Sequence, residues 1–353
     1  MKIKRIEFYP VEMKLSEPYT IAYESIDHTT NVYLRLETDS GITGFGCAAP
    51  DLAVTRETGE SVQKYIDGRA REVLKGTDSL RIAWIMEQLR GDISSDPSAL
   101  AAIDMALYDI LGKNCKMPLW KLLGGFRDHI QTSITIGIMS SAKTVTRARE
   151  FVRDGYHCLK IKGGTDVEAD IETILQVRKA VGQKVELRFD ANQGYTVDQA
   201  IHFVSGTISA KIELMEQPTP SGKPDLLGSV TREVTVPVMA DESLMNIRDA
   251  FRLAQRELVD MVNIKLMKVG GINQAMHINS IARAAGLEVM VGCMDESALA
   301  IAAGLHFALS RPNVVYADLD GHLDLIDDPA QGQILIKDGY MYPSDKPGLG
   351  IDI

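Results

Sequence analysis

Short apolar runs that each end in a charged residue recur through the middle of the chain. The runs have the length and the β-branched content of buried strands, and the segments between them have the character of helices. Strand and helix therefore alternate, which predicts a series of βαβ units with a parallel sheet. The five runs are Cys158–Lys162, Val185–Asp190, Ile212–Glu216, Val236–Asp241 and Met261–Lys265.

The spacing of these runs predicts a barrel. Their charged ends recur roughly every 25 residues, about one strand plus one helix of a (β/α) barrel. We expect Thr132–Ile138 as the first strand, Leu287–Gly292 as the seventh and Val314–Asp318 as the eighth. The carboxyl ends of barrel strands share one rim, so the terminal charges are predicted to converge there.

The pattern before the barrel is different. Alternation in Lys2–Leu15 and Asn31–Thr38 predicts antiparallel strands on either side of a polar loop, Ser16–Thr30, and Asp39–Gly41 predicts a hairpin turn. From Thr55 to Gly112 the apolar period becomes helical. A meander followed by helices is an α+β unit.

Three parts of the chain are expected from these patterns. An α+β capping domain covers residues 1–124, the barrel that carries the charged rim covers 125–320, and a segment at 321–353 returns to the cap. Gly124 and Gly125 mark the join between the first two parts.

Composition narrows the classes of function. The 353 residues are 45% hydrophobic, enough to fill a sizeable core, and the formal charge of -10 argues against nucleic acid and anionic membranes as partners. We find no apolar leader region and no run approaching about 18 apolar residues, so a cytoplasmic protein is expected. The cysteines show no CxxC spacing and predict neither a zinc site nor a disulfide scaffold: Cys47, Cys115, Cys158 and Cys293.

Three carboxylates end consecutive predicted strands. Asp190, Glu216 and Asp241 can thus meet one small cation, and all-oxygen ligation is what Mg²⁺ prefers, with Mn²⁺ as a substitute. Unpaired, the three would repel one another. The alternative is that they form ion pairs with neighbouring lysines.

Three lysines flank the carboxylates. Lys160 and Lys162 are two apart on one strand, so they share a face, and two nearby ammonium groups lower each other's pKa, which suits a general base. Lys265 comes from the far side of the barrel. A substrate carbon between them has a lysine on each face. Removing a proton α to a carboxylate gives an enediolate, which needs a Lewis acid, and reprotonation from the other face inverts the carbon. In the alternative interpretation the lysines only neutralise the acids, which does not explain why they flank them on both sides.

The sequence resembles the enolase superfamily, in its muconate-lactonising subgroup, and is most similar to the dipeptide epimerases of the L-Ala-D/L-Glu epimerase type. The resemblance covers essentially the whole chain. It implies a modified (β/α)7β TIM-like barrel beneath an α+β cap, and an isomerase with one Mg²⁺ per subunit. The matching motifs are Met105–Asp109, Lys160–Lys162, Asp190–Asn192, Glu216–Pro218, Asp241–Ser243, Asn263–Lys268 and Asp318–Asp320.

The resemblance also implies roles for individual residues. Lys162 and Lys265 are the opposed acid and base, and the substrate is a dipeptide whose C-terminal α-carbon is inverted. A homo-oligomer is expected, with neither nucleic acid nor a membrane as a partner. The implied metal ligands are Asp190, Glu216 and Asp241, and the implied substrate-binding residues are Thr135, Lys160, Cys293, Asp318 and Asp320.

Relatives within the subgroup remain as alternatives. Cycloisomerases and o-succinylbenzoate synthases act on substrates without an ammonium group, and N-acylamino acid racemases act on a blocked amine. Asp318 and Asp320 suit a free amino terminus and argue against all three, unless they form a solvated turn. Sugar-acid dehydratases typically use a histidine after strand seven, where Gly292–Met294 offers none. A non-catalytic barrel would have lost rim residues, and none is missing.

Three acids are candidate specificity residues. Epimerases that act on Ala-Glu often carry an arginine in the early cap loop, whereas this chain has Glu24. Asp51 and Asp295 could face the same cavity. If so, cationic or uncharged dipeptides should be preferred over acidic ones. Surface positions for the three acids, and an L-Ala-D/L-Glu epimerase proper, stay open as alternatives.

Overall fold

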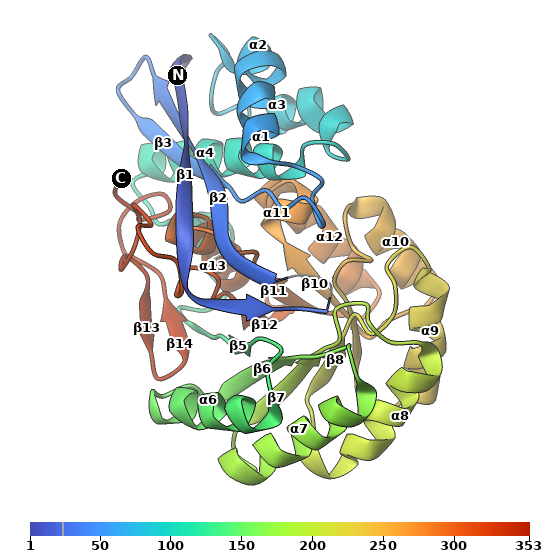
Figure 1. Cartoon of the computed structure of the whole chain (residues 1–353). Helices are drawn as coiled ribbons and strands as arrows, with labels where there is room; N and C mark the ends of the chain where they lie inside the picture. The colour runs from blue at the N-terminus through green and yellow to red at the C-terminus, as the bar shows by residue number, and fades with distance from the viewer. Residues whose placement is uncertain (23–24) are drawn as a thin grey trace.

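Eight parallel strands form one sheet that curls into a nearly closed barrel in the computed structural model, which describes residues 1–22 and 25–353 (Figure 1). Each strand pairs with its neighbour in the chain, from β5 to β12. The ring is brought towards closure where the Ser133 amide donates to Ala317 O at 3.1 Å. The strands are β5 (Ile134–Ile136), β6 (Cys158–Lys162), β7 (Glu186–Asp190), β8 (Leu214–Glu216), β9 (Val238–Ala240), β10 (Met261–Lys265), β11 (Glu288–Gly292) and β12 (Val314–Asp318).

Helices follow the strands and cover the outside of the barrel (Figure 1). Several begin at the side-chain caps that the helix amides require: Asp166 accepts from two amides of α7, and Thr196 forms a capping box with Gln199 at α8. The outer helices are α6 (Ser141–Arg153), α7 (Val167–Val181), α8 (Val197–Thr207), α9 (Pro224–Glu233), α10 (Ile247–Gln255), α12 (Ile272–Ala284) and α13 (Ala298–Ser310), with the short α11 (Leu266–Val269) and η3 (Ile208–Ala210) between them.

The predicted barrel is confirmed, and the bounds of the second, sixth and eighth strands are those expected. The first strand is shorter than the predicted Thr132–Ile138 because its ends have other partners. Ser133 bonds the chain at β12, and the Ile138 amide donates to Thr20 O of the cap at 2.8 Å. Contact with the cap therefore replaces strand pairing after Ile136.

The cap begins with an antiparallel sheet in the order β1-β2-β3, formed by β1 (Ile3–Thr20), β2 (Ser25–Thr38) and β3 (Thr43–Ala48). The predicted polar loop at Ser16–Thr30 is wrong, because most of it continues the two strands, with Tyr19 opposite Ile26. Both strands project beyond the cap core here, and their side chains are mostly exposed or half-buried. The apolar alternation that marks a strand is therefore lost.

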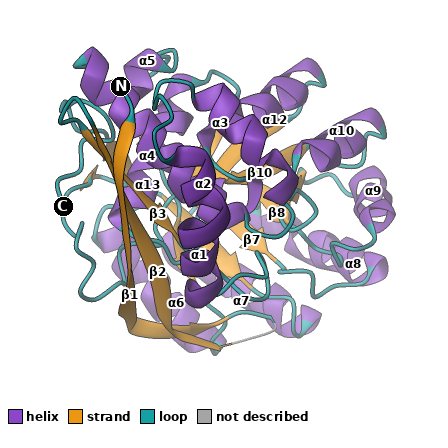
Figure 2. Ribbon diagram, turned by 90° about the horizontal axis from the view of Figure 1, so that it is seen from above, coloured by secondary structure: helices purple, strands orange, loops and turns teal. Residues whose placement is uncertain are grey.

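Helices complete the cap and lie over the barrel when the molecule is viewed from above (Figure 2). The longest, α4, is buried along almost its whole circumference, since it packs between β3 and the barrel. Gly46 of β3 lies directly on the Ala102 carbonyl, where a Cβ would not fit. No helix of the described residues is long and apolar enough to cross a membrane. The cap helices are α1 (Gly59–Tyr65), η1 (Ile66–Ala70), α2 (Arg71–Leu74), α3 (Ile82–Leu89), η2 (Arg90–Asp92), α4 (Pro97–Cys115) and α5 (Leu119–Leu122).

The C-terminal segment contacts both parts. Its strands β13 (Leu335–Lys337) and β14 (Tyr340–Tyr342) pair with β4 (Ile130–Gln131) in the order β13-β14-β4. Further on, the Leu349 amide donates to Asp109 Oδ1 of α4 at 2.9 Å. The domain boundaries expected from the sequence stay a prediction.

Candidate active site

The parallel register brings the charged strand ends to one level of the barrel. Lys162 on β6 pairs with Asp190 on β7, which in turn pairs with Glu216 on β8. Asp241 directly follows β9, and Lys265 ends β10. The strand-end charges are therefore together at one rim, as the sequence predicts.

The three rim carboxylates are almost completely buried. Asp190 Oδ2 and Glu216 Oε2 accept no hydrogen bond from the described residues, although the Lys160 ammonium lies 3.2 and 2.7 Å away. Burial raises the pKa of Glu216 to about 8, with Lys160 opposing the shift. Buried carboxylate oxygens that accept no well-aligned hydrogen bond, in an all-oxygen set, fit a hard divalent cation such as Mg²⁺. Asp190, Glu216 and Asp241 would hold it.

Lysines contact these carboxylates from two sides of the barrel. Lys265 Nζ lies 2.9 Å from Asp241 Oδ2, and Lys162 Nζ lies 3.8 Å from Asp190 Oδ2. The lowering of the pKa that the sequence predicts is wrong for Lys160, and the pKa of Lys265 is shifted in the same upward direction. Burial lowers both pKa values, but neighbouring carboxylates outweigh burial and hold them well above the ordinary value.

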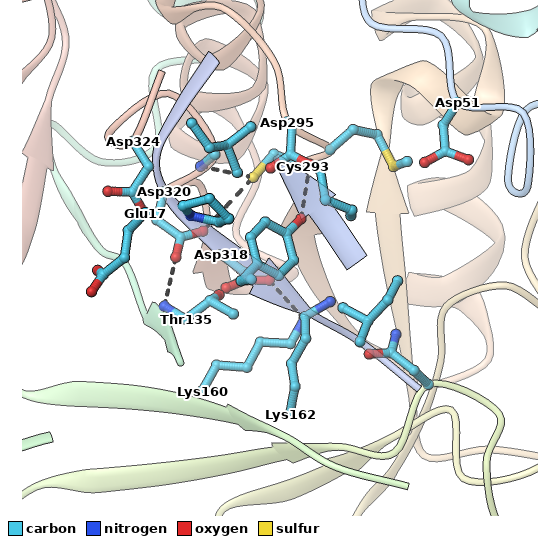
Figure 3. Close-up of a pocket in the computed structure, with 18 of the residues that line it drawn as sticks. Glu17, Asp51, Thr135, Lys160, Lys162, Cys293, Asp295, Asp318, Asp320 and Asp324 are labelled. Atoms are coloured by element: carbon cyan, nitrogen blue, oxygen red, sulfur yellow. Dashed lines mark hydrogen bonds and ion pairs between the residues drawn. The ribbon is translucent and has the colours of Figure 1, made fainter. Parts of the chain in front are cut away.

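Two carboxylates, one at the end of β12 and one two residues later, lie beside the lysines (Figure 3). Asp318 accepts from Lys160 Nζ at 2.8 Å and from Ser133 Oγ at 2.7 Å. Asp320 accepts from the Thr135 amide at 2.6 Å, with Cys293 Sγ 3.9 Å from its other oxygen. Burial, reinforced by Asp318, raises the pKa of Asp320 to about 7. A cation beside Asp320 would oppose this shift and favour the ionised carboxylate.

One cavity between the cap and the rim connects these groups. The cap contributes side chains from β1, β2 and the loop after β3, and the barrel contributes the loops that follow its strands. Of the residues expected from the sequence, the cavity is lined by Asp51, Thr135, Lys160, Lys162, Asp241, Lys265, Cys293, Asp295, Asp318 and Asp320.

The candidate specificity acids have distinct surroundings. Asp295 Oδ2 accepts a hydrogen bond from the Tyr19 hydroxyl at 2.8 Å, and burial raises the pKa of Asp295 to about 6. Asp51 Oδ1 accepts from the Val54 amide at 2.8 Å. Glu24 lies outside the described residues.

Sequence reasoning missed three further acids of the cavity, Glu17, Glu242 and Asp324. Glu17 was assigned to a loop, and recognition of the longer β1 would have pointed to it. Asp324 closely follows Asp318 and Asp320, and this run of acids is the sequence feature that could have identified Asp324 as a residue of the cavity. Lys268 was also missed as a rim residue: it is fully buried and donates to Asp241.

A second group of potential ligand atoms lies at the other end of the barrel. Atoms of Cys158, Glu186 and Glu213 lie within 4.8 Å of one another, and the first two residues begin β6 and β7. Arg188 Nε is 2.7 Å from Glu213 Oε2 and already supplies a positive charge. This group is remote from the rim and is a poor cation site.

Comparison with known proteins agrees with the fold and the rim. Residues 5–124 match the mandelate racemase / muconate lactonizing enzyme N-terminal domain, and residues 143–353 match the enolase C-terminal domain-like family. The chain is 40% identical to the L-Lys-D/L-Arg epimerase of Desulforapulum autotrophicum over 99% of both chains.

Two solved structures are similar over their full length. The dipeptide epimerase from Enterococcus faecalis V583, complexed with Mg and L-Leu-L-Tyr, is 36% identical with a TM-score of 0.97 and 100% coverage of both chains. The dipeptide epimerase from Methylococcus capsulatus, complexed with Mg and L-Arg-D-Lys, is 36% identical with a TM-score of 0.95 and 100% coverage of both chains.

The buried carboxylates, the opposed lysines and the capped barrel define a protein of the enolase superfamily. The chain belongs to its mandelate racemase and muconate lactonizing enzyme family. It is an isomerase of the epimerase and racemase type.

Proposed function

We propose that this protein is a Mg²⁺-dependent dipeptide epimerase that inverts the α-carbon of the C-terminal residue. We further propose that it prefers a cationic or uncharged side chain there over an acidic one. The observation that carries the proposal is the placement of Lys162, Lys265 and the Asp318/Asp320 pair around one cavity. Proton transfer needs a lysine on each side of the α-carbon, and binding of a free amino terminus needs a carboxylate near it.

The two lysines exchange the α-proton. Lys162 comes from β6 and Lys265 from β10, so a carbon held between them has an amine on each face. For one stereoisomer Lys162 takes the proton and Lys265 delivers one to the opposite face, and for the other isomer the roles reverse. Removal of the proton breaks the C–H bond and forms an N–H bond on one lysine, and delivery breaks an N–H bond of the other lysine and forms the new C–H bond. The substrate's composition is therefore unchanged.

The rim carboxylates hold the cofactor in this proposal. Mg²⁺ at Asp190, Glu216 and Asp241 supplies Lewis-acid stabilisation of the negative charge that develops on the substrate carboxylate. Lys268 and Lys265 keep Asp241 ionised: burial alone would raise the pKa of Asp241, but these lysines lower it below its usual value.

Asp318 and Asp320 are assigned to the substrate's amino terminus. Asp320 is the better candidate for direct contact, because Asp318 already accepts from Lys160 and Ser133. Asp320 forms no ion pair with the described residues, and burial, reinforced by Asp318, raises its pKa to about 7. A substrate ammonium group would favour its ionised form. An N-acylated substrate would leave this carboxylate without a partner, which favours a dipeptide over a blocked amino acid.

The preference for side chains rests on Asp51 and Asp295. Both line the cavity, so a glutamate side chain would meet like charge, and a lysine or arginine would gain a partner. The named relatives include L-Lys-D/L-Arg, hydrophobic dipeptide and L-Ala-D/L-Glu epimerases at similar identity. Overall similarity therefore does not choose among them, and the proposed preference is argued from the residues of the cavity alone.

A screen of dipeptides in D₂O tests the proposal. With Mg²⁺ present, the protein should incorporate one deuterium at the C-terminal α-carbon and produce the diastereomer, as seen by mass spectrometry and NMR. N-succinylated and N-acetylated amino acids serve as matched controls. Exchange with the blocked amines and none with dipeptides would overturn the proposal.

A further inference from the structure

The cavity has an acidic group at each of two sides. Figure 3 shows Asp51 on one side, and Glu17 and Asp324 on the opposite side with Asp320 and Thr135. The lysines reach the cavity between these two sides. A dipeptide whose amino terminus lies at Asp320 therefore places its N-terminal residue beside Glu17 and Asp324.

Apolar side chains approach the cavity next to these acids. Leu15 from β1, Met139 after β5 and Phe151 from α6 all line it. An apolar wall that ends in carboxylates matches the lysine and arginine side chains, which have a methylene stem and a charged tip. A short side chain such as alanine would use neither feature.

Asp324 is held in place by the backbone. The Ser16 amide donates to Asp324 O at 2.7 Å, and the Ile326 amide donates to Lys14 O at 2.8 Å, so this loop lies firmly against β1. The carboxylate itself accepts a hydrogen bond from Ser16 Oγ, a neutral donor, at 3.2 Å. The charge of Asp324 is therefore positioned at the cavity without being neutralised by that donor.

Glu17 differs from Asp324 because it already has a cation. Arg147, which itself lines the cavity, lies 2.5 Å from Glu17 and also bonds Glu150 at 3.2 Å, so its charge is shared by these two acids. Arg147 in turn stacks over the Phe151 ring at 4.2 Å. Glu17 thus has an anchored partner, whereas no cationic side chain of the residues that the structure describes forms an ion pair with Asp324.

We propose that Asp324 selects a cationic residue at the N-terminal position of the dipeptide. With Asp51 and Asp295 at the other side, the substrate class becomes dipeptides that are basic at both positions. This inference rests on the proposed function, because it uses the orientation that Asp318 and Asp320 impose.

The test compares kcat/KM for L-Lys-L-Lys and L-Ala-L-Lys. The unmodified protein should favour L-Lys-L-Lys by about fivefold or more, mainly through KM, as expected for a charge-assisted contact. Asp324→Asn should reduce that ratio towards one. Asp324→Lys should reverse it, so that L-Glu-L-Lys becomes the better substrate. Asp345→Asn removes an exposed acid outside the cavity and should leave the ratio unchanged.

The outcomes separate this inference from the proposed function. If no dipeptide is epimerised, the proposed function fails. If dipeptides are epimerised without preference at the N-terminal residue, only the role of Asp324 is wrong. If Asp324→Asn lowers kcat/KM equally for L-Lys-L-Lys and L-Ala-L-Lys, the substitution acts on the structure of the loop. That result would also overturn the inference.

Discussion

The Tyr19 hydroxyl donates a 2.8 Å hydrogen bond to Asp295 Oδ2 and ties the tip of β1 to the loop after β11. The contact occupies one oxygen of Asp295. The main chain of Asp295 is held as well, because Asn31 Nδ2 donates to its carbonyl at 3.1 Å. The cap thus fixes the position of an acid that we assign to substrate selection.

Selection by Asp295 should depend on pH. Burial raises its pKa from 3.8 to about 6, so the carboxyl is ionised above pH 6 and neutral below it. The ratio of kcat/KM for L-Ala-L-Lys over L-Ala-L-Leu should therefore be high at pH 8 and fall through about pH 6. Asp295→Asn should show a low ratio with a flatter pH profile. A ratio that stays high well below pH 6 would contradict this role.

Removal of Asp51 or Asp295 should weaken the discrimination against a substrate with a glutamate side chain. Asp51→Asn and Asp295→Asn each remove a negative charge from the cavity, so kcat/KM for L-Ala-L-Glu relative to L-Ala-L-Lys should rise by about threefold to tenfold in each. Exposed Asp345→Asn is the control, with no change expected. A clear preference of the unmodified protein for L-Ala-L-Glu would sink the idea.

The rim carboxylates should control binding of the metal. Asp190→Asn, Glu216→Gln and Asp241→Asn keep the side-chain size but remove charge, so Mg²⁺ affinity measured by calorimetry should fall at least tenfold. Activity should fall with it. Asp249→Asn, on α10 outside the rim, is a matched control. Full activity in excess EDTA would refute a metal-dependent mechanism.

Protonation of buried His306 should lower the stability of the folded protein in mild acid. Its Nδ1 accepts from the Trp120 amide at 2.9 Å, its Nε2 donates to Leu349 O at 3.1 Å, and burial lowers its pKa from 6.5 to about 4. The folded state thus favours the neutral ring. The contribution of neutral His306 to the free energy of unfolding is complete above pH 6.5 and is lost as the pH falls towards 4.

Urea unfolding between pH 7 and pH 5 measures this effect. One histidine contributes a slope of about 1.4 kcal/mol per pH unit to the free energy of unfolding within this window. His306→Gln should reduce the slope, whatever it does to stability at pH 7. The same change at exposed His202 should leave it unaltered. Equal slopes for all three proteins would show that His306 does not carry the effect.

The barrel and its rim were predictable because local pattern specifies both. A buried apolar run such as Met261–Lys265 predicts a strand. The charged residue at its carboxyl end then lies at the rim that all barrel strands share. The projecting ends of β1 and β2 were not predictable, since their side chains are largely exposed and leave no apolar period. Glu17 was missed for this reason, and its partner Arg147 is distant in the sequence.

The pKa values of the lysines could not be obtained from the sequence. The spacing of Lys160 and Lys162 places two ammonium groups together, which suggests that each lowers the pKa of the other. The structure adds that Lys160 lies 2.7 Å from Glu216 and 2.8 Å from Asp318. Distances of this kind decide which interaction wins, and they depend on the packing of several strands.

Stereospecific exchange in D₂O by lysine variants tests the two-base mechanism most directly. Lys162→Ala should lose epimerisation of L-Ala-L-Lys in both directions but keep α-deuterium exchange from the one diastereomer that Lys265 serves. Lys265→Ala should do the reverse, keeping exchange only from the other diastereomer. Mg²⁺ affinity measured in parallel should change little, because Asp190, Glu216 and Asp241 remain. Epimerisation at a near wild-type rate in either single variant would contradict the account.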